Sequence, residues 1–383
     1  MERQAMYAFS ADPIHYGHTD VIERAAKMFD QVIVGIGDNP LKKYLFSLEE
    51  RLAMAQRTVE NIANVQVISF KGLLVDYAAE NGIGAVIKGI RTEADVDYEL
   101  MLHHVGQSQK VGVDTFFVPA RQDLTHVSSS AVKALQKEQG LVNEYVPLHV
   151  KQALEERISN QYIIGLTGEM GTGKSYVGKK FLELAKAQGI PAHNIELDTI
   201  GHEILGNSPQ ELYKATRETI IQTFAPFTQK IRAPDGSIDR KALGEVVFND
   251  PSKLQKLNEI MHKPLRIKLR RELYGKTGLI FVNAALLAEA QLLYVSNNNT
   301  VLVYADEATQ QKRLQSRGLS IEQIQRRKEG QYTTQQKMIT INKVIEESAH
   351  GFLLSVNNSE GTDQIKEYFQ QVLDSINYKE NKA

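Results

Sequence analysis

Short apolar runs alternate with amphipathic stretches along nearly the whole chain. The stretches carry apolar residues at spacings of three and four, as helices with one buried face do. The runs have the β-branched and aromatic character of buried strands; they lie at 4–9, 31–37, 65–70, 85–90, 114–120, 161–168, 279–287 and 300–305. Strands that alternate with helices predict an α/β fold with doubly wound parallel sheets. Such folds bind ligands at the carboxyl ends of their strands.

The strand–helix pattern begins a second time at residue 161. The segment "QYIIGLTG" (161–168) is typical of a strand that runs into a Gly-rich loop, and a helical pattern follows from residue 174. Just before it, the amphipathic helix predicted over 147–161 becomes polar. A chain of 383 residues is also too long for one ordinary core. We therefore predict two domains, residues 1–158 and 161–383.

Composition narrows the class of protein. The chain is 42% hydrophobic and 24% charged with a net charge of −1, so we expect neither a nucleic-acid nor a membrane partner. The lack of cysteine excludes disulfides, thiolate catalysis and Cys-rich zinc sites. No apolar run approaches the length of a transmembrane helix, and the N-terminus shows no signal pattern. These features favour a cytoplasmic enzyme and leave a homo-oligomer open.

The strongest chemical signal is "GEMGTGKS" (168–175), which has the spacing of a phosphate-binding loop. In such a P-loop the backbone N–H groups surround a phosphate, Lys174 reaches its oxygens and the Ser175 hydroxyl ligates Mg²⁺. A chance glycine-rich turn is the other interpretation. The match lies between a predicted strand and a predicted helix, where a phosphate loop belongs. We predict that this domain binds a nucleoside triphosphate.

Three further residues of the second domain are candidates for chemistry. We expect the next strand, in 192–205, to end on Asp198, which would accept a proton from a substrate hydroxyl or hold Mg²⁺ through water. A helix N-cap is the alternative role for Asp198. Arg313 and Arg317 lie four apart on a predicted helix and are placed to close over phosphates. Alternatively, the two arginines form a solvated charged helix face and have no role in phosphate binding.

Several segments of this domain together resemble a known family. They are "IIGLTGEMGTGKSYV", "IELDTIGHEIL", "DGSIDRKALGEVVFNDPSKLQKLNEIMHKPLR" (235–266), "ALLAEA" and "DEATQQKRLQSRG", and they resemble dephospho-coenzyme A kinase over residues 161–358. The resemblance implies that Asp198 is the base for the ribose 3′-hydroxyl of dephospho-coenzyme A, with Arg313 acting from a lid and His262 and Arg266 lining the acceptor site. It also implies that ATP is held by Gly171, Thr172, Gly173, Lys174, Ser175 and Tyr176.

The kinase resemblance has departures. Glu196 stands first in the family's Asp-x-Asp, Lys263 splits its His-Pro pair, and Ala285 replaces the proline of its Pro-Leu-Leu. The region after Lys337 fits the family's ending poorly. These departures weigh on acceptor specificity more than on ATP binding.

The first domain begins with the loop "AFSADPIHYGHTD" (8–20), between a predicted strand and a helix from Gly17. "HYGH" fits the His-x-Gly-His pattern of nucleotidyltransferases, in which imidazoles contact the phosphates of ATP. A capped polar turn explains the loop equally well by itself. Three companions favour phosphate binding: the Lys42 loop, Lys88 and Arg91 at a strand end, and three serines at a helix start within 124–135. Each could also be a cap or a solvated face.

In this order and spacing, the segments of residues 1–158 resemble phosphopantetheine adenylyltransferase, which has a Rossmann-like nucleotidyltransferase fold. The resemblance places the phosphate of 4′-phosphopantetheine near Ser10, Lys42 and Lys88, with Leu74 against the pantetheine arm. His18 would stabilise the transition state, with Lys42 and Arg91 as the further catalytic residues. The ATP contacts it implies are Ser10, Ala11, His18, Gly89, Ile90, Arg91, Glu99, Leu124, Ser128, Ser129 and Ser130.

This resemblance also has departures. The family's Gly-Thr-Phe-Asp-Pro is "FSADP" here, so Phe9 occupies a glycine position and Ser10 a threonine position. Lys88 stands where the family usually has arginine, and it lacks the guanidinium that can donate two parallel hydrogen bonds to a phosphate. His15 replaces a common threonine.

The two resemblances predict one bifunctional enzyme that converts 4′-phosphopantetheine and ATP into dephospho-coenzyme A and pyrophosphate, then phosphorylates that product with a second ATP, aided by Mg²⁺. One alternative is a kinase whose first domain is a degenerate nucleotide- or coenzyme-binding sensor. The other is a P-loop ATPase or switch whose first domain is a protein-binding scaffold.

Overall fold

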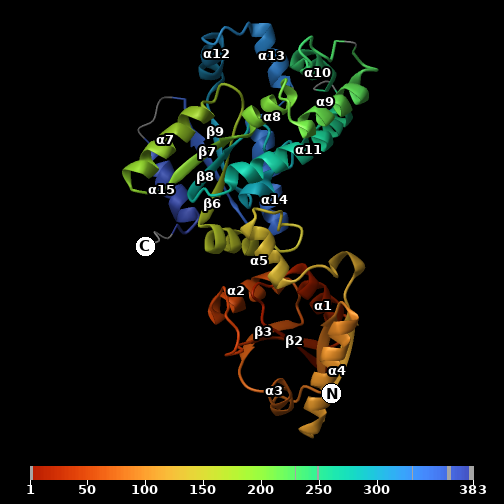
Figure 1. The fold of residues 1–383 in the computed structure, drawn as a ribbon. Coiled ribbons are helices and arrows are strands. Elements are labelled where there is room, and N and C mark those ends of the chain that lie inside the picture. The colour runs from red at the N-terminus through yellow and green to blue at the C-terminus, as the bar shows by residue number, and fades with distance from the viewer. Residues whose placement is uncertain (1–2, 229, 248–249, 330, 360–363, 379–383) are drawn as a thin grey trace. The chain divides into compact units, whose positions relative to one another are not determined.

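Two parallel sheets, one in each half of the chain, organise the protein. The computed structural model describes residues 3–228, 230–247, 250–329, 331–359 and 364–378. The chain divides into a first unit of residues 1–158 and a second unit of residues 159–383, which we describe separately (Figure 1). The predicted α/β class with two doubly wound parallel sheets is confirmed.

The first unit is built on five strands in the order β3-β2-β1-β4-β5, all of them parallel to their neighbours. The strands are β1 (Gln4–Phe9), β2 (Gln31–Gly37), β3 (Val65–Phe70), β4 (Ala85–Ile90) and β5 (Asp114–Pro119). Strand β1 lies at the centre of the sheet and is paired on both sides. Its sequence is a continuous apolar run because both of its faces are buried. The predicted strand over 114–120 ends one residue early, at Pro119.

Helices cover both faces of this sheet because alternate strand residues point to opposite sides. Ala5 and Tyr7 face one core cluster and Met6 faces the other. The helices are α1 (Tyr16–Ala26), α2 (Leu48–Val59), α3 (Leu74–Glu80), α4 (Glu93–Ser108), α5 (Ser129–Lys137) and α6 (Leu148–Leu154), with a 3₁₀ turn at Gln122–Leu124 and a π turn at Glu155–Ser159. Ser47 and Glu50 form a capping box at the start of α2, as their spacing indicates.

The second unit has the strand order β10-β9-β6-β8-β7, again parallel throughout. Its strands are β6 (Gln161–Thr167), β7 (Ala192–Glu196), β8 (Gly278–Asn283), β9 (Asn299–Tyr304) and β10 (Phe352–Asn357). The sequence did not single out β10, which lies in the region after Lys337 that fits the family poorly. The strand predicted over 279–287 ends at Asn283, and a turn begins at Ala285.

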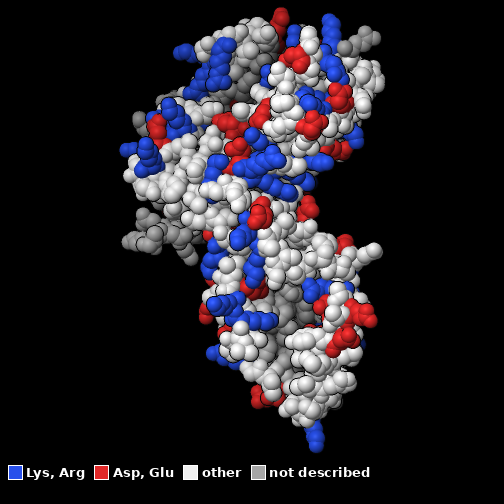
Figure 2. Space-filling view, viewed as in Figure 1, with Lys and Arg blue, Asp and Glu red and all other residues white. Residues whose placement is uncertain are grey.

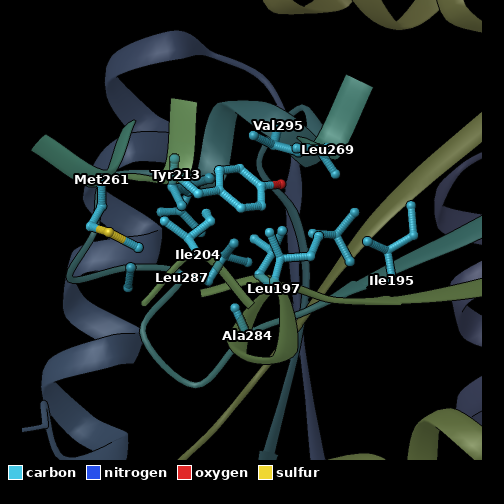
Figure 3. Close-up of a cluster of buried hydrophobic side chains, with 14 of the residues drawn as sticks. Ile195, Leu197, Ile204, Tyr213, Met261, Leu269, Ala284, Leu287 and Val295 are labelled. Carbon is cyan, nitrogen blue, oxygen red and sulfur yellow. The ribbon is translucent and has the colours of Figure 1, made fainter. Parts of the chain in front are cut away.

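The helices of the second unit form its two covering layers. They are α7 (Lys174–Ala187), α8 (Leu197–Leu205), α9 (Glu211–Phe224), α10 (Arg240–Val247), α11 (Pro251–Leu273), α12 (Glu307–Gln315), α13 (Ile321–Glu329), α14 (Thr334–Ser348) and α15 (Ile365–Ser375), with a 3₁₀ turn η3 at Leu293–Ser296. Helices α7 and α15 pack on one face of the sheet. The larger core lies on the other face, where Leu197, Ile204 and Tyr213 of α8 and α9 meet Met261 and Leu269 of α11 (Figure 3).

Two expectations about this unit were wrong in detail. The strand before Asp198 ends at Glu196, so Asp198 lies in the first turn of α8, and Glu196 is the N-cap. The N-cap role that we considered for Asp198 therefore belongs to Glu196. Helix α12 ends at Gln315, so Arg317 lies beyond the helix that carries Arg313. Both errors are shifts of two residues at element ends, where local patterns are weakest.

Surface charge is mixed, and Figure 2 shows both signs interspersed on the visible face. Basic side chains gather along the second half of α11, which includes Lys263, Arg266, Lys268, Arg270 and Arg271 (Figure 2). Among the described residues, no helix is both long enough and apolar enough to span a membrane.

Candidate active sites

The loop after β1 is joined to two other segments by one buried carboxylate. Asp12 accepts hydrogen bonds from the backbone N–H groups of Leu45, at 3.1 Å, and Phe46, at 3.0 Å. It also forms an ion pair of 2.7 Å with Lys133 of α5. The 8–20 loop, the Lys42 loop and the serine-bearing helix are therefore held together at the carboxyl ends of the strands.

Three rings are stacked within this loop. The imidazole of His18 lies between Phe9, with ring centroids 4.1 Å apart, and His15, at 3.6 Å. Burial lowers the pKa of His15 to about 3, with Arg91 adding to the shift. Burial, His15 and Arg91 also lower the pKa of His18 well below its ordinary value. Both imidazoles are therefore neutral at neutral pH, and Phe9, in its glycine position, packs flat against His18.

The proton on His18 can be assigned from one hydrogen bond. Its Nδ1 accepts from the backbone N–H of His15 at 3.3 Å. A neutral imidazole has one donor and one acceptor nitrogen, so Nε2 carries the hydrogen. His18 thus presents an N–H donor, the form that stabilises negative charge on a phosphoryl oxygen.

The end of β4 contributes a second set of predicted residues. Arg91 is paired with Asp95 at 3.1 Å and donates to the carbonyl of Val127, at 3.2 Å, just before the serines. Lys88 and Glu99, assigned to different ligands by the resemblance, form an ion pair of 2.9 Å with each other. Gly89 leaves room for the Tyr7 hydroxyl, which would lie 3.3 Å from a Cβ at that position. Ile90 is the last residue of the strand.

The three serines begin α5, as expected, but two of their hydroxyls have partners. Ser128 is the N-cap and accepts from Ala131 N–H at 3.2 Å. The Ser129 hydroxyl donates to the carbonyl of Pro13 at 2.8 Å, and Ser130 is exposed. Leu124 is half-buried against the core. The start of α5 can therefore bind a phosphate mainly through its backbone N–H groups and the Ser130 side chain.

The remaining predicted residues of this unit differ in exposure. Lys42 is exposed on its loop, and Leu74 is half-buried against the core cluster of Met6. Ser10 is half-buried, and its carbonyl accepts from Arg51 at 2.7 Å. Ala11 is buried with a φ of 51°, an unusual conformation for a residue with a Cβ. No described hydrogen bond or ion pair joins Lys42 or Leu74 to the other predicted residues.

The second site is centred on the Gly-rich loop between β6 and α7. Gly171 and Gly173 have φ values of 84° and 91°, which residues with a Cβ rarely adopt. A Cβ on Gly173 would lie 2.2 Å from Nδ2 of Asn358, so the loop also needs glycine for space. Lys174 Nζ donates to the carbonyls of Gly168, at 2.9 Å, and Glu169, at 3.2 Å. Its ammonium lies within the loop, with Ser175 and Tyr176 exposed beside it.

Charged groups surround Lys174. Burial lowers the pKa of Lys174 to about 8, while the charge of Asp198 opposes that shift. Asp198 is exposed in the first turn of α8, where its carboxylate complements the helix N-terminus. Glu196 is held instead by the side-chain amides of Asn194, at 2.8 Å, and Asn283, at 3.0 Å. The two carboxylates thus differ in access: Glu196 is engaged by two side-chain amides, whereas Asp198 is exposed and accepts from the Ala285 backbone N–H at 3.3 Å.

Arg313 reaches the Gly-rich loop from α12. It donates to the carbonyl of Thr172 at 3.1 Å and to that of Asn358 at 2.8 Å. Asn358 donates to the same Thr172 carbonyl at 2.8 Å. The structure therefore brings Arg313 and the loop together, and Asn358, just after β10, is a member of the site that the sequence did not indicate.

The two predicted acceptor residues lie on α11. His262 and Arg266 are half-buried, one helical turn apart. The buried Nε2 of His262 and Nε of Arg266 have no hydrogen-bond partner among the described residues. No described hydrogen bond joins either side chain to the Gly-rich loop. Pro264, which follows Lys263, lies inside the helix.

Comparison with known proteins identifies both units. A family model described as cytidylyltransferase-like matches residues 7–135, and a dephospho-CoA kinase model matches residues 162–351. A phosphopantetheine adenylyltransferase of Mannheimia succiniciproducens is 41% identical over 157 residues, which are 41% of this chain and 99% of that protein. The chain belongs to the phosphopantetheine adenylyltransferase family through its first unit. Its second unit is a dephospho-CoA kinase domain.

Another sequence relative and a solved structure are also similar to parts of this chain. A phosphopantetheine adenylyltransferase of Pseudarthrobacter chlorophenolicus is 44% identical over 153 residues, 40% of this chain and 92% of that protein. Among solved structures, a dephospho-CoA kinase from Campylobacter jejuni matches 56% of this chain and 97% of its own, with 21% identity and a TM-score of 0.33. The two family resemblances seen in the sequence are confirmed by the sequence matches.

Several residues of the adenylyltransferase unit were missed by sequence reasoning. Arg51 of α2 is 1% exposed and donates to the carbonyls of Ser10 and Gly37, at 2.7 and 2.9 Å. It therefore holds the ends of β1 and β2 together beneath the site. Asp12 and Lys133 join the loop after β1 to the loop after β2 and to α5. All three lie in segments that carry the resemblance, but a surface charge and a buried one look alike in a sequence.

The kinase domain contains a further missed cluster. Lys337 of α14 is completely buried, where it pairs with Glu289 and donates to the carbonyl of Ala285 at 2.7 Å. Its burial lowers the pKa of Lys337, an effect that Glu289 opposes. The local sequence around Lys337 does not indicate its burial, because a buried lysine and an exposed one look alike in a sequence.

Proposed function

We propose that this chain is a bifunctional enzyme of coenzyme A synthesis, with an adenylyltransferase domain (1–158) and a dephospho-CoA kinase domain (161–383). The first domain would join ATP and 4′-phosphopantetheine to give dephospho-CoA and pyrophosphate. The second would phosphorylate the 3′-hydroxyl of dephospho-CoA with another ATP. The observation that carries the proposal is that both families match the same chain, because the product of one family's reaction is the substrate of the other's.

In the adenylyl transfer, the phosphate of 4′-phosphopantetheine would attack the α-phosphorus of ATP in line, and pyrophosphate would leave. No covalent enzyme intermediate is needed, so catalysis consists of positioning and charge stabilisation. The Nε2–H of His18 supports a role as donor to the phosphoryl oxygens. Arg91 and the exposed Lys42 would supply positive charge, with Ser10, Lys88 and Leu74 around the acceptor.

In the phosphoryl transfer, the oxygen of the ribose 3′-hydroxyl would attack the γ-phosphorus of ATP and ADP would leave, while Asp198 would accept the proton of that hydroxyl. Lys174 would leave its loop carbonyls for the β- and γ-phosphates, and Arg313 would neutralise charge from α12. His262 and Arg266 would contact the acceptor. The proximity of Lys174, Asp198 and Arg313 to one loop supports these roles.

The residues around the Gly-rich loop fit a Mg²⁺ ion held jointly with ATP. No group of three or more His, Asp or Glu side chains in the described chain is placed to hold a metal. Mg²⁺ commonly binds through one or two protein oxygens together with substrate phosphates. The exposed hydroxyl of Ser175 and the exposed carboxylate of Asp198 are such oxygens. A bound Mg²⁺ would neutralise phosphate charge.

A kinase with a degenerate first domain is not favoured. The first unit matches nearly the whole length of two proteins named phosphopantetheine adenylyltransferase, at 41% and 39% identity. Phe9 stacks on His18 and does not displace it, so this departure leaves the imidazole in place. Both reactions use ATP, and we propose that they take place in the cytoplasm.

The test is to incubate the purified chain with 4′-phosphopantetheine, ATP and Mg²⁺ and to follow dephospho-CoA and CoA by chromatography. We expect both to form, and the absence of both would refute the proposal. His18→Ala should abolish only the first step, with His104→Ala on exposed α4 as its control. Lys174→Ala should abolish only the phosphorylation of dephospho-CoA, with Lys180→Ala as its control. Supplying dephospho-CoA directly allows this second step to be measured alone.

A further inference from the structure

A buried lysine lies behind the kinase site without contacting any predicted ligand position. The side chain of Lys337 is 0% exposed and that of its partner Glu289 is 5% exposed. Burying an ammonium and a carboxylate is costly even when they are paired, and apolar residues of similar volume often serve stability as well. The pair therefore calls for an explanation beyond packing.

The backbone of Ala285 connects this pair to the candidate base. Its carbonyl accepts from Lys337 Nζ at 2.7 Å and from the Thr167 hydroxyl at 3.3 Å. Its N–H donates to Oδ2 of Asp198 at 3.3 Å. Ala285 begins the turn after β8, and no regular strand hydrogen bond restrains it there. Lys337 thus binds the carbonyl of Ala285, and the N–H of the same residue binds the Asp198 carboxylate.

The first turn of α14 also restrains the Gly-rich loop. Glu169 of the loop accepts from both the N–H and the hydroxyl of Thr334, each at 2.6 Å. The N–H of Met170 donates to the Gln331 side chain at 3.3 Å, and the N–H of Tyr332 donates to Glu289 at 3.0 Å. One short segment, 331–337, therefore sets the Gly-rich loop and the Ala285 turn relative to each other.

We propose that Lys337, with Glu289 as its counter-charge, is a positioning residue for phosphoryl transfer: it fixes Ala285, and through Ala285 it orients the Asp198 carboxylate toward the acceptor hydroxyl. This inference rests on the proposed role of Asp198 as the base. The Ala285 N–H is the essential link, and the proline that the kinase resemblance has at this position could not donate it.

The inference predicts a defect in turnover and not in ATP binding. Lys337→Met alone would strand the charge of Glu289, so the main variant is Lys337→Met/Glu289→Gln, which removes both charges and keeps an acceptor for Tyr332. We expect its kcat for dephospho-CoA phosphorylation to fall about 10²-fold, the cost of a misplaced catalytic group. The KM for ATP and the adenylyl transfer of the same chain should not change.

A double-mutant cycle with Asp198→Asn separates positioning from general structural support. If Lys337 acts through Asp198, the Lys337→Met/Glu289→Gln change should alter kcat by no more than about twofold in the Asp198→Asn background. An equal loss in both backgrounds would overturn the proposal. A matched control is Lys343→Met, an exposed lysine on the same helix, which should leave kcat unchanged.

The link itself is tested by a pair of variants at Ala285. Ala285→Pro removes the N–H and Ala285→Gly keeps it, so only the proline variant should lose kcat, by about the same factor as the charge pair. Equal rates in the two variants would overturn the role of Ala285. If the unaltered chain forms dephospho-CoA but never CoA, the proposed kinase function fails, and this inference fails with it.

Discussion

At the residue scale, both candidate sites depend on groups whose charge is changed by burial. His18 and His15 are kept neutral inside their stack, and Lys174 is only weakly held in its charged form. In each case desolvation of the charged form is the largest cause. Functional sites often use such shifts, because a group must have the right charge at neutral pH.

The imidazole of His18 should stay neutral, with its hydrogen on Nε2, throughout the range in which histidines ordinarily titrate. Its pKa is lowered by burial, and its Nδ1 is engaged by the His15 N–H. Nitrogen-15 NMR of the ring from about pH 8 to about pH 5 should show an Nε2–H signal with no titration. The signal missing in His18→Ala identifies the residue. A titration midpoint near the ordinary histidine pKa would contradict the burial of the His18 ring between Phe9 and His15.

ATP binding by the kinase domain should weaken as pH rises through about 8, the lowered pKa of Lys174. Below this value Lys174 is charged and attracts phosphate; above it the charged fraction falls about tenfold per pH unit. The KM for ATP, measured with dephospho-CoA supplied, should rise correspondingly. Lys174→Arg stays charged in this range and should show a flat profile. A rise of the same size in that variant would point to another group.

At the element scale, the sites are assembled from loops that follow parallel strands, and buried charges set the spacing of those loops. Asp12 ties the loop after β1 to the loop after β2 and to α5. Arg51 ties the ends of β1 and β2, and Lys337 does the same for the turn after β8. Strand ends alone would leave these loops without fixed positions.

Replacing Lys133 with methionine should loosen the first unit, because Asp12 would remain buried without its cation. We expect a loss of about 1–3 kcal/mol in the stability of that unit, the cost of an unsatisfied buried group. Hydrogen exchange of amides in residues 8–20 and 39–47 measures it locally. Lys137→Met, an exposed lysine on the same helix, is the control and should exchange like the unaltered chain. Equal exchange in both variants would show that the ion pair contributes little.

At the scale of the whole molecule, the chain is two folding units in succession. Among the described residues, each of the four hydrophobic clusters lies within a single unit: two flank the sheet of the first and two flank the sheet of the second. A unit that buries its own apolar residues on both faces of its own sheet has the core that a domain requires.

Each unit should therefore fold and act alone. Residues 1–158 expressed separately should form dephospho-CoA at a rate within about twofold of the full chain, and residues 159–383 should phosphorylate it. Circular dichroism and the two assays provide the measurement. Loss of fold or activity in either fragment, with the full chain active, would show that the units depend on each other.

The sequence alone predicts the α/β class, nine of the ten strands in the described residues to within a few residues, and the Gly-rich loop. It could do so because hydrophobic period and glycine spacing are local properties of the chain. It missed β10, whose run "FLLSVN" is short and follows a polar helix. It also placed Asp198 at a strand end and Arg317 on a helix, although each lies two residues past that boundary.

Which charges support the sites depends on the tertiary fold and could not be predicted from the sequence. Asp12, Arg51 and Lys337 look like ordinary polar residues in the sequence, and their roles appear only when residues far apart in the chain come together. The structure also showed that Lys88 and Glu99 are paired with each other and that Phe9 packs against His18. The physical reason is that burial and ion pairing depend on neighbours in space, whereas the pattern along the chain records only neighbours in sequence.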